Sequence, residues 1–166
     1  MNKIEYDINK LKTLSENTKK ETKKVFAKLK KTKPKNLDNF VNNLHYSIFD
    51  KVDCLACANC CRTLGPRITT NDINRLAKFL KQKPKDFINT YLKIDEDNDY
   101  VFKTMPCPFL QDNNYCFVYE HRPKSCREYP HTNRKKYYQI LNLSLKNAET
   151  CPAVYLINKE IVKKYK

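Results

Sequence analysis

Glycine is almost absent from this chain, which has one glycine, Gly65, in 166 residues and no tryptophan. A dinucleotide-binding fingerprint requires three glycines, a phosphate-binding P-loop two, and the nucleophile elbow of hydrolases two, so the composition excludes all three. Left-handed backbone positions, which glycine normally fills, must be taken by other residues. We expect asparagine to take them, because its short polar side chain tolerates that conformation. The candidates are Asn59, Asn98, Asn113 and Asn114.

Long apolar runs are also missing. The first seven residues contain no apolar segment of the kind found in a secretory signal peptide. No uncharged apolar stretch approaches the roughly 18 residues that a membrane span needs. We therefore expect no membrane span and a cytoplasmic location, where thiols stay reduced or bind metal instead of pairing as disulfides.

Acidic residues are few relative to basic ones. The chain has 33 Lys and Arg against 18 Asp and Glu, a net charge of +15, and residues 1–35 alone contribute +8. Such an excess attracts nucleic acid and anionic surfaces, but no RNP, helix-turn-helix or zinc-finger histidine spacing accompanies it. We expect the lysine-rich N-terminal segment to be an exposed helix, with nucleic acid as the less favoured partner.

Apolar residues recur with helical spacing in several segments. This pattern predicts a basic helix over residues 1–35, in which Ile4 belongs to the apolar face and polar residues introduce a break near 15–18. A second helix is expected over about 37–51, with Asn36 as its N-cap. Further helices are expected at 71–82 after a Thr70 cap, from Pro84 to Leu92, and from Pro152 onward, together with a short strand at 100–103.

These elements predict a mainly α fold. We expect a small helical domain whose loops, rich in cysteine and proline, are organised around a metal centre, with at most short strands and a basic N-terminal helix. Residues 137–145 fit a strand or a helix equally well. The predicted boundaries are 1–35 for a basic helical extension and 36–166 for a cysteine-cluster metal-binding domain.

Four of the eight cysteines lie within eight residues, at Cys54, Cys57, Cys60 and Cys61. One C-x2-C pair is typical of half a zinc site, whereas C-x2-C-x2-C resembles the three-ligand loop of a cubane iron–sulfur site, whose fourth ligand comes from elsewhere. The side chains of adjacent residues diverge. Cys60 and Cys61 are therefore expected to serve different centres, or one of them stays unligated.

The other four cysteines lie in loop-like segments near prolines or element ends: Cys107, Cys116, Cys126 and Cys151. A chain reversal at 112–114 would bring Cys107 and Cys116 together. Eight thiols suffice for two four-sulfur sites, or for one cluster and a structural metal. Because the thiols suffice, we expect His121 and His131 to be surface or capping residues, although imidazole also binds zinc and iron.

Basic residues surround Cys126, at Arg122, Lys124, Arg127, Arg134, Lys135 and Lys136. Positive charge would stabilise a thiolate cluster, since four thiolates around one zinc ion carry a formal charge of −2. It could equally hold an anionic substrate or form a solvated loop, and the sequence leaves these alternatives open.

The order of the motifs is specific. The first cysteine cluster is followed by Asp72-Ile73 with Arg75-Leu76-Ala77, Phe87, Tyr91, Cys107-Pro108-Phe109-Leu110, Cys116, Val118-Tyr119-Glu120, Arg122-Pro123, Cys126-Arg127, Pro130 and Cys151. This order resembles the CxxCxxCC family of zinc- or iron-chelating proteins, some of them named iron–sulfur oxidoreductases. The resemblance covers about residues 54–152 and implies that all eight cysteines bind metal. Many members have a glycine after the second cysteine, where this chain has Ala58.

We therefore predict a metal-binding protein whose eight cysteines chelate zinc or iron. The alternative is an iron–sulfur redox protein, either an oxidoreductase or an electron carrier with a 4Fe-4S cluster, whose electron partner would be another protein. A basic zinc protein that binds nucleic acid is a third reading. Soft thiolate ligands favour zinc, iron–sulfur or copper(I) over oxygen-binding cations. No residue is assigned as catalytic, because no Ser/His/acid set and no cysteine with a clear base is present.

Overall fold

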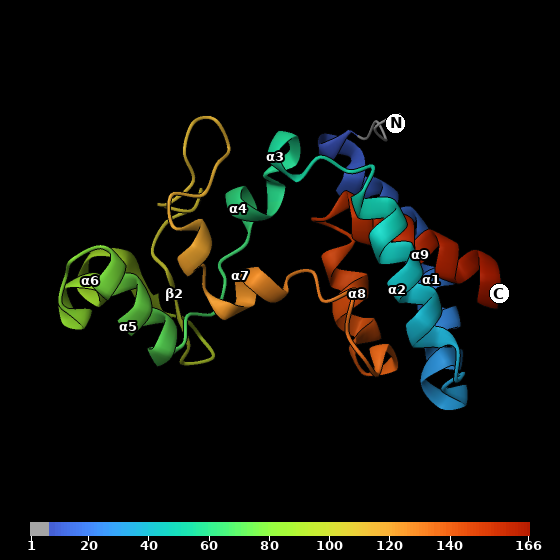
Figure 1. Ribbon diagram of the computed structural model, residues 1–166. Coiled ribbons are helices and arrows are strands. Elements are labelled where there is room, and N and C mark those ends of the chain that lie inside the picture. The colour runs from blue at the N-terminus through green and yellow to red at the C-terminus, as the bar shows by residue number, and fades with distance from the viewer. Residues whose placement is uncertain (1–6) are drawn as a thin grey trace. The chain divides into compact units, whose positions relative to one another are not determined.

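The computed structural model describes residues 7–166 (Figure 1), so the predicted role of Ile4 lies outside the described residues. Helices predominate, which confirms the mainly α prediction. The helices and strands are α1 (Ile8–Thr32), α2 (Leu37–Phe49), α3 (Cys54–Cys57), α4 (Asn59–Thr63), α5 (Thr70–Phe79), α6 (Pro84–Tyr91), β1 (Leu92–Ile94), β2 (Tyr100–Phe102), the 3-10 helix η1 (Tyr119–His121), α7 (Lys124–Glu128), η2 (Tyr137–Ile140), α8 (Leu141–Asn147) and α9 (Pro152–Tyr165).

The chain folds as two compact units. Unit 1 comprises residues 1–57 and 130–166, and unit 2 comprises residues 58–129. The described part of the basic N-terminal segment, α1, packs inside unit 1 against α8 and α9. The boundary at residue 35 remains a prediction about domain organisation.

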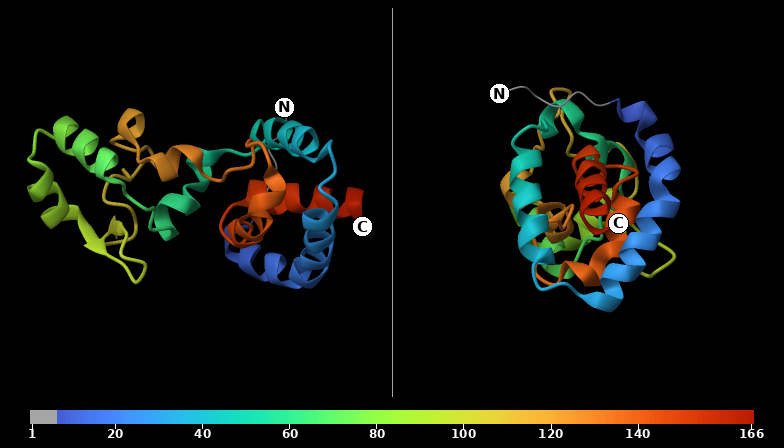
Figure 2. Two further views of the ribbon diagram at one scale, coloured as in Figure 1. Left: turned by 90° about the horizontal axis from the view of Figure 1, so that it is seen from below. Right: turned by 90° about the vertical axis from the view of Figure 1, so that its right-hand side faces the viewer.

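Unit 1 is a helical bundle in which α9 lies between α1 and α2 (Figure 2). Ala153, Val154, Ile157 and Ile161 of α9 are fully buried, because the helix contributes apolar side chains to both neighbours. Pro152 begins α9, as predicted, at a position where its missing N–H costs no hydrogen bond.

The first helix is unbroken, so the predicted break near 15–18 is wrong. The polar residues of its middle face inward: Ser15 and Thr22 are 5% and 4% exposed. The hydroxyl of Thr22 donates to the carbonyl oxygen of Thr18 (2.9 Å), and that of Thr18 donates to Leu14 (3.2 Å). These bonds to the preceding turn satisfy the hydroxyl groups without interrupting the helix.

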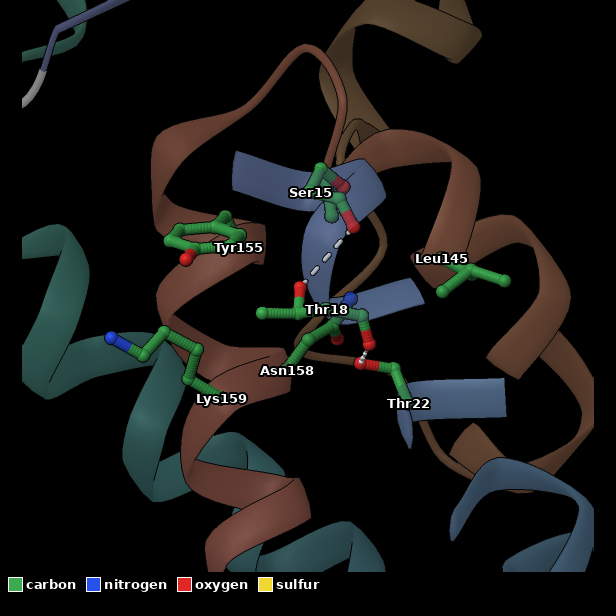
Figure 3. Close-up of a pocket in the computed structure, with 8 residues that line it drawn as sticks. Ser15, Thr18, Thr22, Leu145, Tyr155, Asn158 and Lys159 are labelled. Carbon is green, nitrogen blue, oxygen red and sulfur yellow. Dashed lines mark hydrogen bonds between the residues drawn. The ribbon is translucent and has the colours of Figure 1, made fainter. Parts of the chain in front are cut away.

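Residues 137–145, which the sequence left undecided, are helical and form η2 and the start of α8. Buried polar groups join α8 to its neighbours: the Tyr137 hydroxyl lies 2.6 Å from Ser144 Oγ, which donates to Asn158 Oδ1 at 2.7 Å. A small pocket lies beside this network (Figure 3), lined by Ser15, Thr18, Thr22, Leu145, Ala148, Tyr155, Asn158 and Lys159. It has room for about one water molecule.

Unit 2 packs α5 and α6 against a two-stranded antiparallel ribbon, with Leu92 opposite Phe102 and Ile94 opposite Tyr100. The strand at 100–103 was predicted, but Leu92 belongs to β1 and not to the preceding helix. The N-cap of α5 is Thr69, one residue before the predicted Thr70, because Thr69 and Asp72 form a reciprocal capping box. Asn36 precedes α2 but makes no side-chain capping bond.

Left-handed positions are shared among several residue types. Asn98 and Asn114 adopt them as predicted, but Asn59 and Asn113 do not. Lys33 and Lys81, which follow the ends of α1 and α5, also adopt positive φ, since a residue after a helix end commonly turns left-handed. Ala58 has φ 44°, so the residue after Cys57 is left-handed although it is not glycine.

Candidate metal-binding cysteines

The thiols of unit 2 gather where three loops meet. The backbone N–H of Cys107 donates to the carbonyl oxygen of Cys61 at 2.8 Å, which joins the first cysteine cluster to the loop that follows β2. The predicted reversal between Cys107 and Cys116 is confirmed, because Leu110 pairs with Cys116 in an isolated antiparallel bridge. The third loop brings in Cys126 on α7.

These four cysteines interact electrostatically. Ionised Cys61 and Cys116 raise the pKa of Cys107, and ionised Cys107, Cys61 and Cys116 raise that of Cys126. Burial is the larger cause in both, and it raises the pKa of Cys107 to about 11 and that of Cys126 to about 12. Burial also raises the pKa of Cys116. Without a metal, Cys107 and Cys126 are therefore neutral at pH 7.

Backbone N–H groups point at the sulfurs. Cys107 accepts hydrogen bonds from the N–H of Phe109 and Leu110, and Cys116 accepts one from Val118. Such bonds stabilise a thiolate, and hydrogen bonds to sulfur tune thiolate metal sites. At Cys107 and Cys116 these bonds lower the pKa, but burial outweighs them.

Cys60 and Cys61 lie side by side, with their sulfurs 3.9 Å apart. The hydrogen bond from Cys60, together with the charges of Arg122 and Arg62, lowers the pKa of Cys61 to about 7 against the effect of burial. Cys61 is thus the thiol of this group that ionises most easily.

Arg122 is the cation of the basic stretch that acts on these thiols. Its charge lowers the pKa of Cys61, Cys116 and Cys126. Its guanidinium lies 3.5 Å from the ring centroid of Tyr119, and its Nε donates to the carbonyl oxygen of the same residue at 2.7 Å. Lys124 instead pairs with Glu128 at 3.7 Å.

A buried carboxylate organises the loop that carries Arg122 and Cys126. Asp72 is 1% exposed and accepts hydrogen bonds from the N–H and hydroxyl of Thr69, from Arg75 Nη2 at 2.5 Å and from the N–H of Lys124 at 3.0 Å. Arg75 Nη2 also donates to the carbonyl oxygen of Arg122 at 2.8 Å. The order of motifs includes Asp72 and Arg75 but assigns them no role; their i, i+3 spacing after a threonine that can cap a helix is the signal in the sequence that indicates it.

Unit 1 contains a second group of thiols. Cys54 and Cys57 begin and end α3, whose first turn is capped by Asp53 Oδ1, the acceptor for the N–H of Leu55 and Ala56 at 3.0 and 3.1 Å. Cys151 precedes α9 and accepts hydrogen bonds from the N–H of Ala153 and Val154. Burial raises the pKa of Cys151 to about 12, and the charges of Cys54 and Cys57 raise it as well.

All eight cysteines are free thiols. Among residues 7–166, no three or more His, Cys, Asp and Glu side chains are drawn together as a ligand shell that could hold a metal ion. The two groups are therefore neighbourhoods of thiols, not closed coordination shells. Cys61, Cys107, Cys116 and Cys126 form the group of unit 2, beside Cys60, and Cys54, Cys57 and Cys151 form that of unit 1.

The histidines have other neighbours. The His121 ring lies 4.3 Å from the ring of Phe79, and His45 Nδ1 lies 2.7 Å from Thr132 Oγ1. Burial lowers the pKa of His45. That His121 and His131 are not ligands remains a prediction.

Comparison with known proteins identifies one family. The model of the CxxCxxCC family, described as a zinc- or iron-chelating domain, matches residues 53–152. Curated proteins and solved structures yield no match. Within the part of the chain that the structure describes, no helix is long and apolar enough to cross a membrane.

Proposed function

The chain belongs to the CxxCxxCC family of zinc- or iron-chelating domains, and on this basis we propose that it holds zinc or iron in two separate thiolate centres. The observation that carries the proposal is the gathering of Cys61, Cys107, Cys116 and Cys126 in unit 2, with backbone N–H groups directed at their sulfurs. Cys54, Cys57 and Cys151 would supply the ligands of the other centre in unit 1.

The chemistry of the donors fits these metals. Thiolates are soft ligands, and four of them suit tetrahedral zinc or iron. A bound metal deprotonates coordinating thiols, which removes the energetic conflict between burial and ionisation at Cys107 and Cys126. Arg122 and Arg62 would offset part of the negative charge that results.

The free cysteines also bear on the location of the protein. Eight reduced cysteines persist in a reducing compartment, so we infer a cytoplasmic location. If iron is held with inorganic sulfide as a 4Fe-4S cluster, the protein would carry electrons for a protein partner. This redox role is the second candidate, because four thiolates, the number gathered in unit 2, are the ligand set of a 4Fe-4S cluster.

The test is metal and acid-labile sulfide per chain on protein purified without oxygen, together with an absorption spectrum. Zinc at about one or two per chain without sulfide supports a chelating protein. Iron at about four per chain with equal sulfide and absorption near 400 nm supports the redox candidate. Protein that binds neither metal after reconstitution contradicts both.

Single variants test the division into two centres. Cys126→Ser should lose the metal of unit 2 and retain that of unit 1, whereas Cys151→Ser should do the reverse. Ser125→Ala is a matched control on α7, since its hydroxyl donates to the carbonyl oxygen of Arg67 and lies beside Cys126 in the chain. If either cysteine variant loses all bound metal while its helical content is unchanged, the two-centre arrangement is wrong.

A further inference from the structure

The positive charge of the chain is divided very unevenly between the two units. The residues of unit 1 include 21 Lys and Arg against 9 Asp and Glu, a net charge of +12, whereas unit 2 has 12 against 9, a net charge of +3. Positive and negative charges are thus nearly balanced in unit 2, which has most of the proposed metal ligands, and the helical bundle of unit 1 carries the excess positive charge.

Within unit 1, segments far apart in the sequence bring cations to one end of the bundle. Lys28 Nζ donates to the carbonyl oxygens of Tyr165 and Lys166 at 3.3 Å, which joins the end of α1 to the end of α9. Lys33 lies 5.2 Å from the ring centroid of Tyr138, which joins the α1–α2 turn to η2. Figure 1 shows these segments around the α1–α2 turn of the bundle.

We name this surface the basic end and define it by ten exposed residues: Lys28, Lys31, Lys33, Lys35, Arg134, Lys135, Lys136, Lys163, Lys164 and Lys166. Carboxylates are scarce beside it. Asp38 accepts hydrogen bonds from the backbone N–H groups of Lys136 and Tyr137 at 2.6 and 2.9 Å, and Glu21 pairs with Lys166. Like charges on one surface repel one another, so the surface favours a polyanion that neutralises them.

The apolar side chains near the basic end are not available to a membrane. Leu29, Leu37 and Ile161 are at most 1% exposed, and none of the exposed large apolar residues among the described residues lies within 28–35, 134–136 or 163–166. Helices that bind the membrane surface bury an apolar face beside their cations. The basic end lacks that face.

The aromatic rings nearby are already covered. Lys164 Nζ lies 3.8 Å from the ring centroid of Phe40, and Lys33 occupies the face of Tyr138. Single-stranded nucleic acids are held by exposed rings on which bases stack. Lysine ammonium groups, as point charges, suit the regular phosphates of a duplex.

We propose that the basic end binds the phosphate backbone of double-stranded nucleic acid without reading its sequence. The α1 helix alone gives a solvated basic face, as expected from the sequence. The structure adds the cations of η2, of the segment before it and of the end of α9, and these complete the surface. The interaction does not require either metal centre.

The experiment measures binding of the metal-loaded full chain to a fluorescein-labelled DNA duplex of about 24 base pairs, by anisotropy between about 0.05 and 0.2 M salt. If about half of the ten cations each neutralise one phosphate, log K should fall against log salt with a slope of about −4 to −5. A second duplex of unrelated sequence should bind equally well.

The variant Lys31→Gln/Lys35→Gln/Lys163→Gln removes three of the exposed cations. It should weaken binding at 0.1 M salt at least tenfold and reduce the steepness of the slope by up to about 2.7. Lys83→Gln/Lys85→Gln/Lys93→Gln is the matched control, with the same loss of charge from exposed lysines of unit 2. Both proteins should keep the far-ultraviolet circular dichroism of the wild type.

Two results would overturn the proposal. One is equal loss of affinity in both triple variants, which would mean that net charge alone governs binding. The other is binding to vesicles containing anionic phosphatidylglycerol but not to the duplex, which would identify a membrane surface as the partner.

Discussion

Removing the charge of Asp72 is expected to destabilise unit 2 more than any other single acidic substitution there. The carboxylate accepts hydrogen bonds from Thr69, Arg75 and Lys124 while almost completely buried. In Asp72→Asn, one oxygen becomes an amide donor that faces other donors. Losing about two hydrogen bonds to a charged group, at roughly 1.5–3 kcal/mol each, predicts a destabilisation of about 3 kcal/mol after partial rearrangement.

This change should be large in a thermal unfolding experiment. For a domain of about 60–100 residues, 1 kcal/mol shifts Tm by roughly 4–8 °C, so the Asn variant should melt roughly 12–24 °C lower. Asp86→Asn is the control, because Asp86 occupies the same third position of α6 but is exposed. It should shift Tm by no more than a few degrees. Equal melting of Asp72→Asn and the wild type would refute the assigned role of the carboxylate.

The acid dependence gives the Asp72 prediction a second readout. Burial raises the pKa of Asp72, but hydrogen bonds from Thr69, Arg75 and Lys124 outweigh it and lower the pKa below the ordinary value. The contribution of the carboxylate is therefore fully present above the unfolded pKa of about 3.9 and is lost as pH falls through the lower folded pKa. The gap in stability between wild type and Asp72→Asn should be widest near pH 6–7 and should narrow below about pH 4. A stability difference that does not change with pH would mean that the charge of Asp72 is not what stabilises unit 2.

Three further predictions concern the thiols. Cys61→Ser should abolish metal binding in unit 2, whereas Cys60→Ser should retain it, because Cys107, Cys116 and Cys126 approach Cys61. Metal analysis of the two variants checks this prediction. Equal loss of metal in both would contradict the assignment of adjacent cysteines to different roles. Removal of metal by a chelator should lower the melting temperature of unit 2. It should leave most of the helical circular dichroism, because the apolar core of α1, α2 and α9 needs no metal. Complete loss of the helical signal would contradict this prediction. Arg122→Gln should weaken zinc binding about three- to tenfold at pH 7, with a smaller effect near pH 9, because the guanidinium lowers the pKa of three thiols that the metal must deprotonate. Competition with a coloured chelator measures the zinc affinity, and Arg127→Gln is the control.

The sequence predicted helix starts and helix faces correctly where a residue type has one well-defined effect on the backbone. Pro84 and Pro152 begin helices because a proline at the first helical position loses no hydrogen bond. The apolar spacing over 37–51 corresponds to α2. The order of motifs identified the family and its zinc- or iron-chelating character.

Tertiary contacts decided what the sequence left open or misjudged. The polar residues at 15–18 suggested a break in α1, but the helix continues through them. Ser15 is buried, and the Thr18 hydroxyl donates to the carbonyl oxygen of Leu14. The grouping of the cysteines also depends on tertiary contacts. Spacing alone links Cys54 and Cys57 to their nearest neighbours in the chain, whereas the interaction with Cys151 spans almost a hundred residues and depends on where α9 begins.

Contacts that need no metal hold the cysteine loops of unit 2 in place. Cys107 is held to Cys61 by a backbone hydrogen bond, Cys116 by the bridge to Leu110, and the segment before Cys126 by the bond from Lys124 to Asp72. Small zinc fingers have no such supports and are unfolded without metal. Here α5 and α6 pack on an apolar core, and Cys107 and Cys116 pack against the same core. Metal binding should therefore close a preorganised set of loops, so that it stabilises unit 2 without being the sole source of its fold.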